Sequence, residues 1–116
     1  MKRLRNHWIG IDQGDTVMFS DFEDGGEMWT GHGPREKRRR IKFRESFRTP
    51  PVIQCALSMW DTDNTTFQRG DISAERIEAD GFELVFKTWA DSRIARARIR
   101  WTAIGELRHA DEWDIY

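Results

Sequence analysis

The sequence predicts an all-β protein, either a sandwich or a barrel of antiparallel strands. Three observations lead to this prediction. Apolar and polar residues alternate over several short stretches, most clearly within residues 71–105. Turn-forming residues, mostly glycine, aspartate and asparagine, separate these stretches. No segment shows a helical period of comparable quality, and 116 residues suffice for one domain with a packed core.

The N-terminal half is expected to form three strands and one long loop. Short strands at 7–11 and 16–19 flank a predicted turn at 12–15, which reads Asp-Gln-Gly-Asp. Residues 20–35 are rich in glycine and include a proline, so we expect a long loop there. The next strand is predicted at 37–47. Its apolar side consists of Ile41, Phe43 and Phe47.

The C-terminal half is predicted to contain four strands. The first, at 52–60, follows two prolines and places Cys55 on its apolar face, which predicts a buried, unreactive thiol. The second, at 72–79, is expected to be irregular near Glu75, where the apolar parity shifts. Asp80 and Gly81 predict a hairpin turn into the third strand. That strand presents Phe82, Leu84 and Phe86 on one face, and the fourth alternates apolar residues with Arg96, Arg98 and Arg100.

These three arginines would stand in a row on one face of the last strand, about 7 Å apart. Like charges at that spacing repel unless they are paired. The first interpretation is cross-strand pairing with acids such as Glu75 and Glu83. A contact with acids of a neighbouring subunit, or a groove for an anionic glycan or phosphate, are the alternatives.

The composition argues against several classes of partner. The net charge is −1, from 19 basic and 20 acidic side chains, so no overall field attracts nucleic acid or a membrane surface. The basic run at 35–40 is split between two strand faces, and we expect no nucleic-acid binding. No stretch approaches the roughly 18 apolar residues of a membrane span, so no membrane insertion is expected. The N-terminus lacks the apolar run of a secretory signal, and synthesis in the cytoplasm is expected.

No residue pattern indicates catalysis or a cofactor. His7, His32 and His109 lack metal-ligand spacing, and the Asp61–Asn64 stretch lacks the glycine and glutamate of a calcium loop. No nucleophile motif or phosphate-binding loop stands out. We therefore expect neither enzyme activity, nor a cofactor, nor a metal site. Residues 1–105 are expected to form the domain, and 106–116 a C-terminal extension whose apolar residues (Trp113, Ile115 and Tyr116) favour docking.

Several short motifs occur in a common order between Arg38 and Gly105. They are Ile-Lys-Phe at 41–43, the stretch from Phe47 through two prolines to Val52, Asp61, Gly81-Phe82, Trp89, and the Trp101–Gly105 stretch. This segment resembles the H-type lectin domain of snail agglutinins and of the C-terminal half of discoidins. The resemblance implies a six-stranded antiparallel β-sandwich that assembles as a trimer or a dimer of trimers. It also implies binding of a sugar, typically N-acetylgalactosamine, in clefts between protomers.

The resemblance also implies a set of ligand-binding residues. Arg69, Trp89 and the following Ala90 and Asp91 fall on the family's site, together with the early loop Gly31, His32 and Gly33. The sequence departs from the snail proteins at four points: Ala90 replaces a histidine, Ala95 an aromatic residue, His32 or a neighbour an acidic residue, and the cysteine pair is missing. The expected ligand is therefore a glycan that is N-acetylgalactosamine-like or anionic.

The residue chemistry agrees with this set while leaving alternatives open. Trp89 could stack on the apolar face of a sugar or pack against the sandwich rim. Arg69 carries a planar fork of donors that suits hydroxyls, an acetamido carbonyl or a carboxylate, although it could also be solvated. Asp91 and Ser92 also suit turn formation.

The function expected from the sequence is multivalent glycan recognition, of the kind used in cell adhesion. The alternative is a structural or attachment component of a phage-like particle that keeps the lectin fold without a working pocket. For either function we expect a bacterial protein that leaves the cytoplasm, if at all, by release or as part of a virion-like particle.

Overall fold

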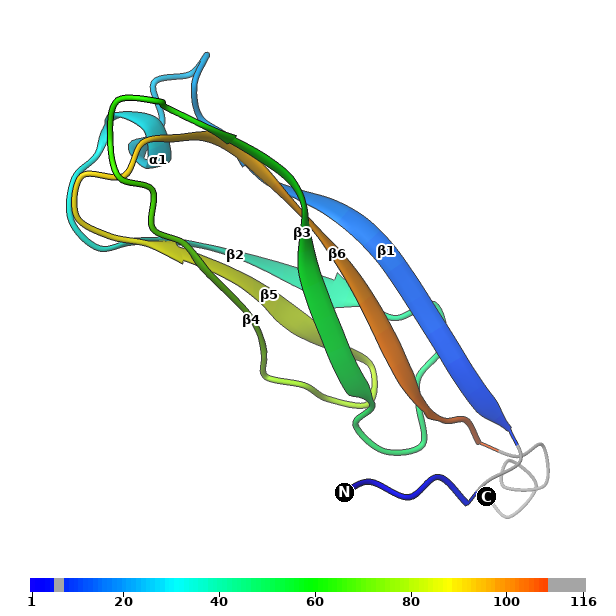
Figure 1. Cartoon of the computed structure of the whole chain (residues 1–116). Helices are drawn as coiled ribbons and strands as arrows, with labels where there is room; N and C mark the ends of the chain where they lie inside the picture. The colour runs from blue at the N-terminus through cyan, green and yellow to red at the C-terminus, as the bar shows by residue number, and fades with distance from the viewer. Residues whose placement is uncertain (6–7, 109–116) are drawn as a thin grey trace.

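The protein is an all-β sandwich of two three-stranded antiparallel sheets, described here by a computed structural model for residues 1–5 and 8–108. One sheet has the order β1-β6-β3, built from Ile9–Ser20, Ile94–Glu106 and Val52–Thr62. The other has the order β2-β5-β4, built from Arg35–Lys42, Gly81–Thr88 and Asp71–Glu75. Figure 1 shows the sheets as two layers, with α1 (Glu27–Thr30) at one end. The predicted six-stranded sandwich is confirmed.

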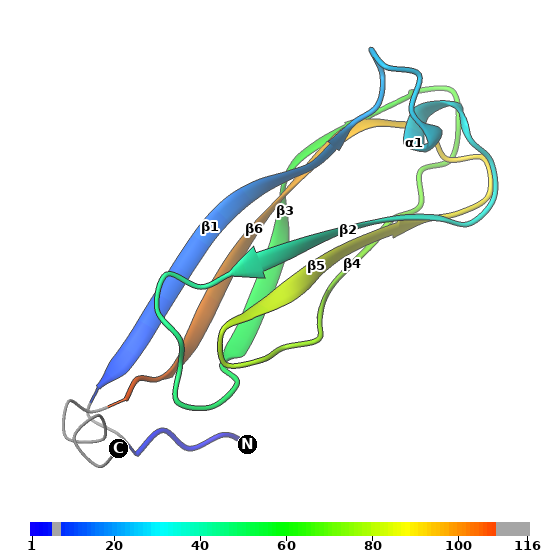
Figure 2. The ribbon, with the colours of Figure 1, turned by 180° about the vertical axis from the view of Figure 1, so that it is seen from behind.

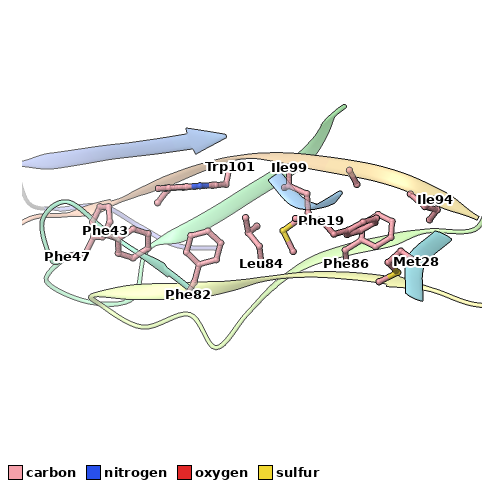
Figure 3. Close-up of a cluster of buried hydrophobic side chains, with 13 residues drawn as sticks. Phe19, Met28, Phe43, Phe47, Phe82, Leu84, Phe86, Ile94, Ile99 and Trp101 are labelled. Carbon is pink, nitrogen blue, oxygen red and sulfur yellow. The ribbon is translucent and has the colours of Figure 1, made fainter. Parts of the chain in front are cut away.

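The core lies between the layers and follows the alternation of β5 and β6 (Figure 3). Phe82, Leu84 and Phe86 of β5 are fully buried, as predicted from their spacing. They face the inward row of β6, which consists of Ala95, Ala97, Ile99, Trp101 and Ala103. Phe82 meets Trp101 edge-on at 5.3 Å and Phe86 meets Phe19 at 5.2 Å, geometries that aromatic pairs prefer.

The first strand differs from the prediction. The predicted turn at 12–15 is wrong, because β1 runs without a break through these residues and pairs with β6 along its length. Asp12 is buried on the inner face, where its carboxylate accepts bonds from the backbone N–H and the guanidinium of Arg44, at 2.9 and 2.8 Å. Gly14 lies directly beneath the indole of Trp101, so a side chain at this position would collide with the ring. Asp12 and Gly14, which suggested a turn, are therefore inward-facing residues of a continuous strand.

Other boundaries also shift. The predicted long loop contains the single turn α1, and β2 ends at Lys42, so the predicted strand at 37–47 is too long. Phe43 and Phe47 are nevertheless buried, from the loop after β2. The strand predicted at 72–79 is also too long: β4 (Asp71–Glu75) ends where the irregularity was expected, and Arg76 has a φ of 49°. Antiparallel pairing of β4 with β5 confirms a hairpin, but residues 76–80 connect the two strands and Gly81 already belongs to β5.

The arginine stripe of β6 is paired, but not with the predicted acids. Because β6 lies between β1 and β3, its neighbours come from those strands: Arg96 binds Asp61 at 2.9 Å, and Arg98 and Arg100 approach Asp15 at 3.4 and 3.3 Å. Glu75 and Glu83 belong to the other sheet, where both bind Arg38. Cross-strand pairing was the correct interpretation, and its partners were wrong.

Cys55 is half-buried and not fully buried as predicted, because β3 is an edge strand of its sheet. Burial raises the pKa of its thiol. In the described part of the chain, no helix is long and apolar enough to cross a membrane. Strand β6 ends at Glu106, and residues 109–116 lie outside the described residues, so docking of the C-terminal extension stays a prediction.

Candidate functional site

Three loops meet at one end of the sandwich, which Figures 1 and 2 show as the end that carries α1. The first comprises residues 21–34 and leads into β2. The second comprises residues 63–70 and connects β3 to β4, and the third comprises residues 89–93 and connects β5 to β6. All the residues predicted to bind ligand lie in these loops. Their relative positions depend on a few hydrogen bonds between the loops.

Arg35 holds the first loop against the third. Its buried guanidinium donates to four carbonyl oxygens: those of Gly33 (2.9 Å), Glu27 (3.1 Å), Met28 (3.3 Å) and Ala90 (3.2 Å). The backbone N–H of Gly33 also donates to the Ala90 carbonyl oxygen, at 2.9 Å. Gly33 and Ala90 both have a positive φ, of 77° and 59°, and glycine adopts such a conformation without strain. Gly31, Gly33 and Ala90 therefore contribute to the loop structure through backbone hydrogen bonds and not through side chains.

Ser92 holds the second loop against the third. Its fully buried hydroxyl accepts a bond from the backbone N–H of Arg69 (2.8 Å) and donates to the carbonyl oxygen of Phe67 (3.0 Å). Thr88 donates its hydroxyl to the Arg69 carbonyl oxygen at 2.5 Å. The backbone around Arg69 is therefore fixed from two sides, which limits the positions open to its side chain.

Arg69 and Asp91 form an exposed ion pair between the second and third loops. The guanidinium is 3.1 Å from the Asp91 carboxylate and lies 5.9 Å from the centre of the Phe67 ring. Trp89 follows β5 directly and is 41% exposed, so it is not sealed inside the core. A partly exposed indole at a strand end leaves an apolar surface for a ligand. The turn itself lies at Ala90-Asp91, and Ser92 acts by joining the second and third loops and not by forming the turn as predicted.

Trp89 borders a groove of about 600 Å³ on the outer side of the β2-β5-β4 sheet. Three charged residues, Glu36, Lys87 and Asp71, form one cross-strand row in its lining. Among the predicted site residues only Trp89 lines this groove. His32 is exposed on the first loop, and the structure does not bring it to the groove.

The sequence reasoning missed two parts of this site. The role of Arg35 is hidden in the basic run at 35–40, although its place directly after a glycine-proline loop suits an arginine that binds the loop's carbonyl oxygens. The charged row was missed because it depends on the register of three strands. Both features join residues that are distant in the sequence and become neighbours only in the folded chain.

The arrangement suits a polar ligand that has one apolar face. An indole supplies the apolar wall, carboxylates accept hydrogen bonds from hydroxyls, and Lys87 and Arg69 donate them. No cluster of three histidine, cysteine, aspartate or glutamate side chains within residues 1–5 and 8–108 is placed to hold a metal ion.

Comparison with known proteins identifies the family. The model of the H-type lectin domain matches residues 38–104, more than half of the chain. The chain belongs to the H-type lectin domain family. The expected resemblance is thereby confirmed, and the family supports a carbohydrate-binding protein of the lectin kind.

One relative is similar in sequence, and two solved structures are similar in fold. A protein of Fuscovulum blasticum, named ATP synthase subunits region ORF 7, is 52% identical over 107 residues, which cover 92% of this chain and 93% of that protein. Discoidin II of Dictyostelium discoideum has a similar structure, with a TM-score of 0.72 at 21% identity, over 90% of this chain and 39% of discoidin II. The tailspike protein gp49 of Pseudomonas phage LKA1 has a TM-score of 0.53 at 12% identity, over 86% of this chain and 15% of the tailspike chain.

Proposed function

We propose that the protein is a multivalent lectin that binds a glycan at Trp89, in clefts between the protomers of a trimer. The observation that carries this proposal is the exposed indole at the end of β5, which borders a groove and precedes the loop whose Asp91 pairs with Arg69. The loops on either side are fixed by Arg35 and Ser92, so the site is formed before ligand arrives. Preorganisation reduces the entropy that binding costs.

The groove chemistry supports a hydroxylated ligand. Glu36 and Asp71 can accept bonds from sugar hydroxyls, and Lys87 can donate to a ring oxygen, an acetamido carbonyl or a carboxylate. Arg69 adds a planar donor that is itself partly satisfied by Asp91. This mixture of signs is compatible with an N-acetylgalactosamine-like sugar and with an anionic one.

An exposed apolar row supports the proposed oligomer. Ile11, Ile104 and Val52 are cross-strand partners in β1, β6 and β3 and share the outward face of that sheet. They are 67%, 38% and 49% exposed. Apolar side chains gathered on one sheet face are typical of a subunit contact. We propose that protomers meet through this face, and that further assembly into a dimer of trimers would double the number of sites.

Repetition of the site would make weak binding useful. Several sites held in fixed geometry raise apparent affinity by about 10²- to 10⁴-fold without any new contact. A single shallow groove beside one tryptophan therefore suffices for recognition of a cell surface.

A glycan array tests the proposal. The parent protein should bind a defined set of glycans, and Trp89→Ala and Arg69→Ala should lose that signal while keeping the parent's mass. Trp89→Phe retains an aromatic face and should keep part of the signal. Light scattering should give three times the 13.8 kDa of one chain, or six times for a dimer of trimers. Ile11→Asp should lower that mass.

A second candidate function is an attachment or structural component of a phage-like particle that keeps the fold without a working pocket. The fold likeness to a phage tailspike protein is compatible with it. A stable oligomer with no glycan signal at high density on the array would favour this alternative. A monomer with no signal would contradict both functions.

A further inference from the structure

A second hollow, of about 330 Å³, lies at the loop end of the sandwich and shares no residue with the groove at Trp89. Its lining includes two aromatic rings, two carboxylates, a hydroxyl and a guanidinium. These groups belong to Phe22, Trp29, Glu23, Asp61, Thr62 and Arg96. The proposed function uses none of them, and the family resemblance includes only Asp61, as a motif residue and not as a ligand-binding residue.

The segment that carries Phe22 is held firmly in place. The preceding Asp21 is buried, and its backbone N–H donates to the Ala95 carbonyl oxygen at 2.7 Å. Its carboxylate accepts a bond from the backbone N–H of Met28 at 3.0 Å, at the start of α1. A Cβ at Gly26 would lie 2.3 Å from the Asp21 side chain, so only glycine allows this close packing. The hollow is therefore preformed.

The two aromatic rings are also positioned by specific contacts. Phe22 meets Trp29 edge-on, with ring centres 4.9 Å apart. The guanidinium of Arg93 lies 4.4 Å from the centre of the Trp29 ring, and its Nε donates to the Trp29 carbonyl oxygen at 3.1 Å. Phe22 nevertheless remains 58% exposed. A fixed segment thus presents an exposed aromatic ring beside a hollow, where the ring can serve as an apolar wall for a ligand.

The polar groups restrict the ligand class. Asp61 and Arg96 form an ion pair at 2.9 Å, and both side chains are about half exposed, so each keeps hydrogen-bonding capacity for a ligand. An anion would meet the carboxylates of Glu23 and Asp61, and a cation would meet Arg96. A purely apolar ligand would strip water from the ion pair without replacing its hydrogen bonds. A neutral ring that has hydroxyls on its edge and an apolar face is repelled by neither charge, and its hydroxyls replace the water that hydrogen-bonds the ion pair.

We propose that this hollow is a second carbohydrate subsite, which binds a neutral pyranose against Phe22 and hydrogen-bonds its hydroxyls to Asp61, Glu23 and Arg96. It goes beyond the proposed function, because it operates whether or not the groove at Trp89 binds sugar. Two subsites at one end of each protomer would let the protein engage a branched glycan, or two glycans, at the same surface.

Protein-observed NMR tests the subsite with simple probes. The methyl glycosides of galactose, glucose and mannose, and N-acetylgalactosamine, are each titrated to about 50 mM, well above a millimolar Kd. At least one should produce saturable shifts of the backbone amides of Phe22 and Glu23 and of the Trp29 indole N–H. Phe22→Ala should weaken this response by about 10-fold or more, and Phe22→Tyr should preserve it.

Two controls separate this subsite from the groove. Trp89→Ala should leave the shifts at Phe22 and Trp29 unchanged, whatever it does to glycan-array binding. Phe67→Ala removes another exposed phenylalanine from the loop end and should also leave them unchanged. Shifts confined to the surroundings of Trp89, or no saturable shift with any probe, would overturn the subsite. A fall in oligomer mass for Phe22→Ala would also overturn it, because the ring would then be a subunit contact.

Discussion

The buried Arg35 guanidinium offers the sharpest mutational test of how the site is built. Replacement with alanine removes donors from four carbonyl oxygens. Two of these acceptors keep a backbone donor, because Gly31 also donates to Glu27 and Gly33 also donates to Ala90. The other two, on Met28 and Gly33, lose the guanidinium bond. At about 1–3 kcal/mol for each acceptor left without a partner, of which that of Met28 is buried and that of Gly33 half-buried, Arg35→Ala should destabilise the fold by about 2–6 kcal/mol.

Urea-induced unfolding, followed by circular dichroism at one fixed protein concentration, measures this loss. Arg40→Ala is the matched control, since Arg40 lies on the same strand but its contacts are exposed: ion pairs with Glu78 and Asp80 and one hydrogen bond to the Arg76 carbonyl oxygen. Its cost should stay within about 1 kcal/mol. Arg35→Lys should fall between the two, because one ammonium cannot reach all four carbonyls. A free energy of unfolding for Arg35→Ala within about 0.5 kcal/mol of the parent would refute the reasoning.

Three further predictions test the fold. Gly14→Ala should destabilise by about 1–3 kcal/mol, because the new methyl group meets the Trp101 indole; an unchanged melting temperature would contradict this packing. The Thr65 hydroxyl, which hydrogen-bonds Asp63, chiefly lowers the pKa of that carboxyl, so its stabilisation is present at neutral pH and lost as the pH falls through the folded-state pKa. The stability difference between the parent and Asp63→Ala should therefore shrink on acidification, and a constant difference from pH 7 to about pH 3 would argue against it. Burial raises the pKa of the Cys55 thiol, so a thiol reagent at neutral pH should label the folded protein more slowly than the urea-unfolded protein, and equal rates would exclude this effect.

The strands that form the centre of the sandwich were the most predictable from sequence. In β5 and β6 the inward residues are apolar and the outward ones are polar except for Val85 and Ile104, so alternation places Phe82, Phe86 and Trp101 in the core. The beginning of β1 could not be predicted in this way. There the inward positions include Asp12 and Gly14, whose roles depend on Arg44 and Trp101, residues distant in sequence.

The candidate site was only partly predictable for a similar reason. Trp89 could be located because an aromatic residue at a strand end, before a polar turn, stands out in the sequence. The groove beside it depends on the register that aligns Glu36, Lys87 and Asp71 across three strands. Sequence periodicity gives the face that each residue occupies, but not its partner across the sheet.

The central claim is that Trp89 contacts the glycan. Titration calorimetry with the strongest glycan from the array, comparing the parent with Trp89→Ala, tests it most directly. Loss of the stacking surface should cost about 1–2 kcal/mol, a 5- to 30-fold rise in Kd, with the fold and the oligomer mass unchanged. An unchanged Kd for that glycan would contradict the claim.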